Sequence, residues 1–144
     1  MLLVKQKEAL EVLEAQAFKM DDIDLQPLRI TSSWHVEWNL FYEVDPSKET
    51  MQYLDSSSLL HLNNYYLMRA INLDYRPENN VNGHFYLRVL NLKEVISSKS
   101  KEVSFDADWE NLYFELKSKS RIEIVKQIER LVRETPPFKE KNIN

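Results

Sequence analysis

Apolar and polar residues alternate along the segment WHVEWNLFYEV, which covers residues 34–44. One side of the alternation carries Trp34, Val36, Trp38, Leu40, Tyr42 and Val44, and the other carries His35, Glu37, Asn39, Phe41 and Glu43. A period of two is that of a β-strand, whose successive side chains point to opposite faces. The pattern therefore predicts a central strand that lies across a hydrophobic core and turns a polar, acidic face outward. Asp45 and Pro46 are expected to end it, because proline cannot donate to a sheet ladder.

Two other segments carry the helical period. Residues 1–20 have apolar side chains at spacings of three and four, which predicts an N-terminal amphipathic helix. Residues 120–134 predict a C-terminal helix with a buried stripe that includes Ile124, Ile128 and Leu131. Ser120 precedes Glu123 by three positions, which is the spacing of a capping box. Residues 135–144 are expected to form a polar tail.

Two apolar runs, residues 65–75 and 84–92, flank a loop that contains Asn82 and Gly83. Asn-Gly is a strong turn signal because both residues tolerate positive φ, so the runs predict an antiparallel hairpin. Shorter strands are expected over residues 28–31, 103–105 and 112–116, with an exposed connection at residues 93–101. The whole pattern predicts one α+β domain over residues 1–144, a central antiparallel sheet with an N-terminal and a C-terminal helix packed on it.

A chain of 144 residues has the size of one ordinary domain. The sequence contains no cysteine, which excludes disulfides, thiolate nucleophiles and cysteine-based zinc sites. Charged residues recur every few positions in residues 1–20, unlike a signal peptide, and no apolar run reaches the length of about 18 residues that spans a bilayer. These features predict a cytoplasmic protein that makes no membrane contact.

Negative charge is concentrated in one part of the chain. The net charge is −4, but residues 21–60 contain eight acidic and two basic side chains, whereas residues 61–134 contain eleven acidic and twelve basic ones. An acidic segment repels phosphate, so we expect no nucleic-acid partner and favour a basic protein partner. A solvated acidic surface explains the same composition without a partner.

No motif of strong catalytic specificity is present. A single glycine is too few for a phosphate loop or a dinucleotide turn, and the sequence lacks HExxH and GxSxG. His35, Glu37 and Glu43 share one face of the predicted strand, which would suit acid–base chemistry or three metal ligands. The polar outer face of a half-buried sheet requires the same residue types. We therefore expect no catalytic residue, cofactor or metal, and keep an enzyme or small-ligand domain that uses this face as the alternative.

The remaining aromatic and histidine residues have structural interpretations. Trp34 and Trp38 are predicted to pack in the core, since no basic groove accompanies them for stacking on a base. His61 lies in an apolar run and is predicted to be a hydrogen-bonded core or boundary residue, while His84 is predicted to start a strand at the surface. Trp109 stands between two acidic residues, and we expect it to be partly exposed and a candidate interface anchor.

Three stretches resemble one known family. WHVEWNLFYEVDP, residues 34–46, resembles the W-x-V-x-x-N-x-F-[YF]-D-[VI]-D-P opening of small bacterial immunity proteins, the cytosolic antidotes encoded beside polymorphic and contact-dependent toxins. INLDYRPE, residues 71–78, followed by Gly83 resembles their I-D-L-G-W-Y-P-[ED] … G-x-[FY]-x-L hairpin. DWEN, residues 108–111, and the segment from Phe114 to Glu129 resemble their ending, although Asp74 replaces a glycine and Leu112 a common proline.

The resemblance implies an α+β fold and a non-enzymatic inhibitor that binds one cognate toxin domain stoichiometrically. It carries no catalytic residues. Together with the charge distribution, it suggests that the toxin domain is basic, as a nuclease would be, and that a subunit of some other assembly is a further alternative. The residues expected to bind the partner are Asp21, Asp22, Asp24, Glu37, Glu43, Asp45 and Trp109.

Overall fold

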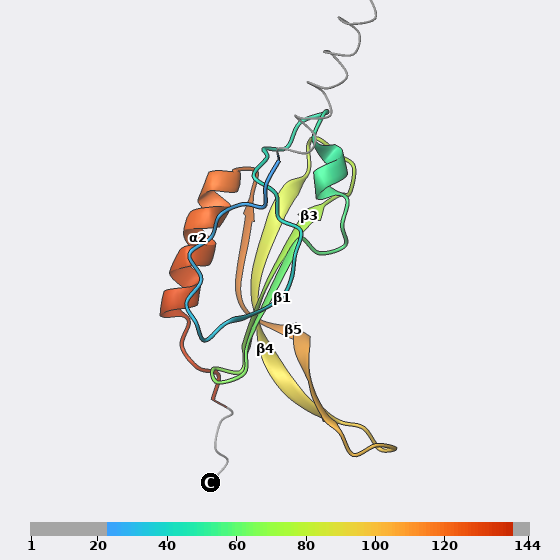
Figure 1. Ribbon diagram of the computed structural model, residues 1–144, viewed down its shortest axis with the longest axis vertical. Coiled ribbons are helices and arrows are strands. Elements are labelled where there is room, and N and C mark those ends of the chain that lie inside the picture. The colour runs from blue at the N-terminus through green and yellow to red at the C-terminus, as the bar shows by residue number, and fades with distance from the viewer. Residues whose placement is uncertain (1–22, 140–144) are drawn as a thin grey trace, which may run out of the picture.

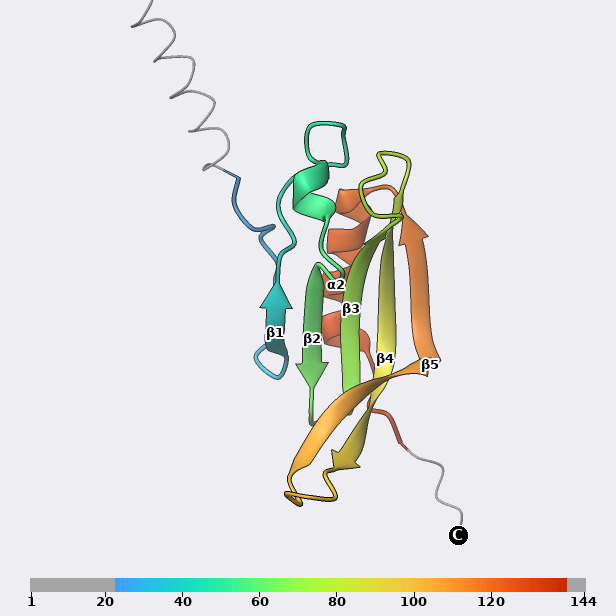
Figure 2. The same cartoon turned by 90° about the vertical axis from the view of Figure 1, so that its right-hand side faces the viewer.

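The computed structural model describes residues 23–139, so the predicted N-terminal helix over residues 1–20 lies outside the described part. Five strands form one antiparallel sheet in the order β1-β2-β3-β4-β5, which Figure 2 shows face on. The elements are β1 (His35–Asn39), the 3-10 helix η1 (Met51–Leu54), β2 (Leu60–Asn64), β3 (Arg69–Arg76), β4 (His84–Ile96), β5 (Val103–Ser118) and α2 (Arg121–Glu134).

Helix α2 packs on one face of this sheet (Figure 1), as the sequence predicts for the C-terminal helix. Its buried side chains are Ile124, Ile128, Leu131 and Val132. They share one hydrophobic core with residues of the sheet that point to the same side, among them Leu62, Ile71, Leu73, Phe85, Leu87 and Val89. The α+β class and the antiparallel sheet are thereby confirmed, and α2 is the one α-helix among residues 23–139.

The start of α2 is capped by three side chains. The backbone N–H of Glu123 donates to Oγ of Ser120 at 3.2 Å, which is the first half of the predicted capping box. The second half passes through Ser118, whose hydroxyl donates to Oε2 of Glu123 at 2.7 Å and accepts from the backbone N–H of Ser120 at 3.0 Å. The helix N-terminus therefore has the polar partners that its free N–H groups require.

The central hairpin forms, but with different bounds and for a different reason. β3 begins at Arg69, because residues 65–68 make the turn that leads from β2, and β4 begins at His84 as predicted. Gly83 does not adopt positive φ, which occurs in this loop at Asn79 instead (φ 55°). A Cβ at Gly83 would lie 2.8 Å from the carbonyl oxygen of Arg76 and 2.8 Å from Cε1 of Tyr75. Any larger residue at position 83 would clash with these atoms, so the position requires glycine.

The segment predicted as the central strand lies at the edge of the sheet. β1 covers only residues 35–39 and pairs with β2 alone, and a bulge interrupts the register between Val36 and Trp38. The bulge makes Glu37 an extra residue and shifts the alternation by one position, so Trp38 pairs beside His61 on the face without α2. The prediction that Trp38 packs in the core is therefore wrong.

The two residues after β1 follow the same shift, since Leu40 is 42 % exposed although it was assigned to the core face, and Phe41 is fully buried although it was assigned to the polar face. Val36 precedes the bulge and pairs with the buried Leu62, yet it is 50 % exposed at the edge of the sheet, so its assignment to the core is also wrong. The chain leaves β1 after Asn39, whose Oδ1 accepts from the backbone N–H of Phe41 at 3.0 Å. Trp34 is buried as predicted. The strand expected at residues 28–31 does not form.

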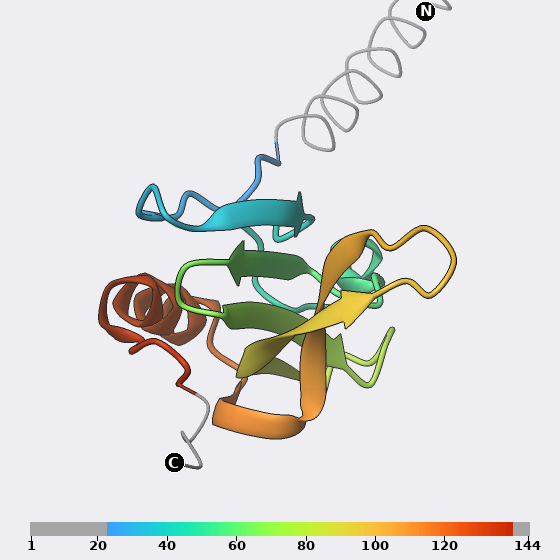
Figure 3. The same ribbon diagram turned by 90° about the horizontal axis from the view of Figure 1, so that it is seen from below.

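β4 and β5 continue far beyond the other strands. Of the predicted exposed connection, residues 93–96 belong to β4 and residues 97–101 form an exposed turn, while the two short strands expected at residues 103–105 and 112–116 are one strand. Register shifts between Val89 and Asn91 leave residues 109–111 and Tyr113 as extra residues of β5. Bulges bend a strand, and the part beyond them, residues 91–108, folds across the face opposite α2 (Figures 1 and 3). We call this part the arm.

Candidate functional site

The arm and the sheet enclose a groove of about 320 Å³ on the face opposite α2. On the sheet side it is lined by Glu37 and Trp38 of β1 and by His61 and Asn63 of β2. On the other side it is lined by Phe105, Asp106, Ala107 and Trp109 of β5. We call this hollow the arm groove. Both β1 and β5 contribute residues from their bulges, since Glu37 and Trp109 are extra residues in the register.

Trp38 is oriented by two neighbours within the sheet. Its Nε1 donates to Oγ of Ser58 at 3.1 Å, and its ring stacks on the imidazole of His61 with a centroid distance of 4.7 Å and an angle of 18°. The indole remains 44 % exposed, and Trp109 across the groove is 52 % exposed. The partial exposure predicted for Trp109 is confirmed. Two large aromatic surfaces are thus held beside one hollow and left accessible.

Glu37 is fixed by a hydrogen bond from Tyr65. The phenol donates to Oε1 of Glu37 at 2.6 Å, and this bond is the main reason that the pKa of Tyr65 is raised above 10.0. The ring of Tyr65 also contacts those of His35 and Phe105, each at a centroid distance of 5.2 Å. Tyr65 therefore links β1 to the arm and holds the carboxylate of Glu37 at the groove.

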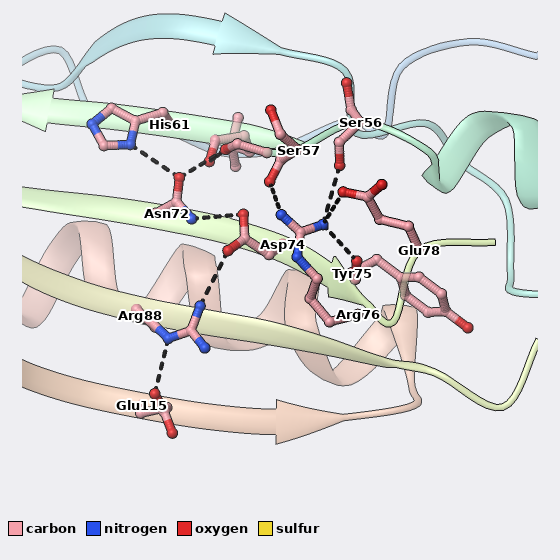
Figure 4. A network of polar contacts seen from close by, with 12 residues as sticks. Ser56, Ser57, His61, Asn72, Asp74, Tyr75, Arg76, Glu78, Arg88 and Glu115 are labelled. Carbon is pink, nitrogen blue, oxygen red and sulfur yellow. Dashed lines mark hydrogen bonds and ion pairs between the residues drawn. The ribbon is translucent and has the colours of Figure 1, made fainter. Parts of the chain in front are cut away.

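A chain of polar contacts begins at His61, which lines the groove, and runs across the sheet to β5 (Figure 4). Nδ1 of His61 lies 3.1 Å from Oδ1 of Asn72, and Nδ2 of Asn72 donates to Asp74 at 3.0 Å. Arg88 then pairs with Asp74 at 3.1 Å and with Glu115 at 2.9 Å. His61 is 7 % exposed, so its interpretation as a hydrogen-bonded boundary residue is confirmed. We call these five residues the polar ladder.

Ser58 connects Trp38 to the polar ladder, because its hydroxyl also donates to Oδ1 of Asn72 at 2.7 Å. The loop that carries Ser58 is held by Arg76, whose guanidinium donates to the carbonyl groups of Ser56 and Ser57 (Figure 4). Buried polar groups that satisfy one another in this way keep a single arrangement. The position of Trp38 is thus set by contacts that reach from β1 to β5.

Of the predicted partner-binding residues, Glu37 and Trp109 meet at the arm groove although they are distant in sequence. Asp24, Glu43 and Asp45 do not line it. Asp21 and Asp22 lie outside the described residues.

Asp45 has a structural role. Its Oδ1 accepts from Nε of Arg121 at 3.0 Å, which ties the loop after β1 to the start of α2. A hollow of about 390 Å³ lies beside this pair and is larger than the arm groove. Its charged Asp45 and Arg121 already satisfy each other, so we regard the arm groove as the better candidate.

The alternative site made of His35, Glu37 and Glu43 does not form as predicted. β1 ends at Asn39, and Glu43 lies beyond it, where its backbone N–H donates to the carbonyl oxygen of Asp24 at 3.0 Å. Only His35 and Glu37 converge, since both contact Tyr65. Within residues 23–139, no three histidine or carboxylate side chains are arranged to hold a metal ion.

Sequence reasoning missed Trp38, Phe105 and Asp106 as groove residues. Strict alternation placed Trp38 in the core, and the bulge that reverses it depends on pairing with β2. The adjacent apolar residues Leu40 and Phe41 were the one local sign that the alternation fails. Phe105 was assigned to a short strand over residues 103–105 and Asp106 to no element, because nothing local indicates that the arm folds back over the sheet.

No helix within residues 23–139 combines the length and hydropathy needed to cross a bilayer. Comparisons of the chain with protein-family models, with curated proteins and with solved structures give no match.

Proposed function

We propose that this chain is a binding protein that captures a basic protein domain at the arm groove and neutralises it in a one-to-one complex, as an immunity protein does with its toxin. The observation that carries the proposal is the meeting of Glu37 and Trp109 at one groove. The sequence singles out both as partner contacts, one for its charge and one for its aromatic ring. The lining adds a second carboxylate, Asp106, and contains neither lysine nor arginine.

The groove has the two properties that a tight protein interface requires. Carboxylates accelerate the encounter with a basic surface, and a few large aromatic side chains near the centre of an interface supply most of its binding energy. Trp38 and Trp109 are exposed together beside one hollow. Apolar surface gathered in this way on a polar face is typical of interaction sites.

The proposal is tested by co-expressing the chain with the C-terminal domain encoded by any toxin gene that lies next to its own. We expect growth to be rescued and a one-to-one complex to be seen by size-exclusion chromatography with light scattering. Trp109→Ala and Glu37→Lys should weaken the rescue. Glu49→Lys is the matched control, because Glu49 is an exposed acidic residue that does not line the groove. A wild-type chain that neither rescues growth nor forms a complex would contradict the proposal.

A further inference from the structure

We propose that the arm groove seats one arginine side chain, which stacks on the exposed indoles and pairs with the carboxylates of Glu37 and Asp106. The inference relies on the proposed function for the source of the arginine, a basic partner protein. It adds the chemical group that the groove recognises.

The carboxylates of Glu37 and Asp106 form no ion pair within the described residues, whereas several other acidic side chains of the molecule do. Asp74 and Glu115 pair with Arg88, and Asp45 pairs with Arg121. Lys93 lies opposite Asp106 in the register but forms no ion pair with it, so a partner cation would meet carboxylates that the described residues leave unpaired.

Glu37 is prepared to bind such a cation. Its Oε1 accepts from the hydroxyl of Tyr65, which fixes the carboxylate, and no hydrogen bond from the described residues engages Oε2. A carboxylate held in one orientation loses less side-chain entropy when it binds. The hydrogen bond from Tyr65 is retained when glutamine replaces glutamate, because the amide oxygen also accepts. Glu37→Gln therefore removes the charge and keeps the hydrogen bond from Tyr65.

The aromatic lining selects arginine over lysine. Guanidinium is planar, weakly hydrated and able to stack on an aromatic face while it donates to a carboxylate, whereas ammonium is a compact and strongly hydrated point charge. The inner face of the Trp38 indole stacks on His61, so the opposite face is the one available at the groove. The volume of about 320 Å³ lies at the small end of ligand pockets, which span roughly 300–1,000 Å³, and it suits one side chain.

The test is an NMR titration of the full ¹⁵N-labelled chain with three capped tripeptides, acetyl-Gly-X-Gly-amide, in which X is arginine, lysine or citrulline. Citrulline keeps the planar shape but carries no charge. We expect the arginine peptide to shift the indole N–H signals of Trp38 and Trp109 saturably, and the citrulline peptide to bind about tenfold more weakly. Trp34 is an internal reference, because it is buried and its Nε1 donates to the carbonyl oxygen of Val132 at 3.0 Å.

Glu37→Gln should weaken binding of the arginine peptide severalfold, while Glu49→Gln should leave it unchanged. Equal affinity for arginine and citrulline, or a shift of Trp34 as large as that of Trp38, would overturn the inference. Shifts that depend on protein concentration without peptide would overturn it in favour of a second copy of the chain.

These results are separable from those for the proposed function. A stable toxin complex that forms equally well with Trp38→Ala and Glu37→Gln would overturn the arginine seat and leave neutralisation intact. Selective arginine binding without any toxin complex would support the seat and contradict neutralisation.

Discussion

Tyr65 shows how one side chain couples three parts of the molecule. Its hydroxyl binds Glu37 of β1, and its ring contacts His35 of β1 and Phe105 of the arm. A phenolate could not donate this hydrogen bond and would repel the carboxylate of Glu37. The contact therefore depends on the protonation of Tyr65, whose pKa is raised above 10.0 chiefly by the hydrogen bond itself.

This coupling predicts a pH dependence. Because the folded-state pKa of Tyr65 lies above the unfolded value, its contribution to stability is complete below pH 10.0 and is lost as the pH rises through the folded-state pKa. Glu37→Ala removes both the hydrogen-bond acceptor and the negative charge and should lower the pKa of Tyr65 towards 10.0. The titration of the tyrosine Cζ signals by ¹³C NMR measures this shift. Tyr75 is the control, because its raised pKa comes mainly from burial and should not respond.

Gly83 is a second residue whose role is defined by close contact. In Gly83→Ala the new methyl group would meet the Tyr75 ring and the backbone of Arg76, so the free energy of unfolding should fall by about 1–3 kcal/mol, as overpacking does. Asn82→Ala alters the exposed neighbouring residue and should change the free energy of unfolding by no more than about 0.5 kcal/mol. Urea unfolding compares the two variants. If Gly83→Ala left the free energy of unfolding unchanged, the loop would have moved aside without cost, which would contradict this prediction.

At the scale of elements, α2 shows what local pattern can determine. Its period, its cap and its buried stripe are all visible in sequence, and the structure confirms each. β1 and the arm show the opposite. A bulge depends on which residue of the neighbouring strand is paired, so Glu37 and residues 109–111 cannot be recognised as extra residues from their own sequence. Two of the residues predicted to bind a partner, Glu37 and Trp109, line the groove, but the groove itself was not predicted.

The cap of α2 supplies a prediction at this scale. Ser120→Ala leaves the N–H of Glu123 without its side-chain acceptor and should destabilise the protein by about 1 kcal/mol. Ser98 lies at an exposed position of the loop that joins the two strands of the arm, so Ser98→Ala should change the stability by no more than about 0.5 kcal/mol. Thermal or urea unfolding measures both. Equal stability of the two variants would show that Ser118 alone satisfies the helix start.

For the whole molecule, the sheet has two faces with different tasks. One is covered by α2 and contains the main hydrophobic core, while the other carries the polar ladder, the arm and the groove. Composition predicted an acidic interaction surface but assigned it to one segment of sequence. The groove instead combines Glu37 from that segment with Asp106 and Trp109 from the nearly neutral remainder, because only the folded sheet places them together.

Electrostatic steering is tested on the complete complex. Reversing both groove charges, with Glu37→Lys and Asp106→Lys, should lower the association rate with the toxin domain, and the difference from wild type should shrink as salt screens the field. Stopped-flow fluorescence of the exposed tryptophans measures the rate, and Glu49→Lys controls for net charge. An association rate that is the same for wild type and variants at every salt concentration would exclude electrostatic steering by the groove.

The bulges at the base of the arm also affect how such a protein can diverge. Because they absorb the mismatch between β4 and β5, residues in the arm can be replaced, inserted or deleted without changing the register of the sheet beneath. Phe105 and Asp106, which the arm contributes to the groove, are not among the residues of the main core. A scaffold built in this way can acquire a new partner by changing its arm while its folding stays under separate selection.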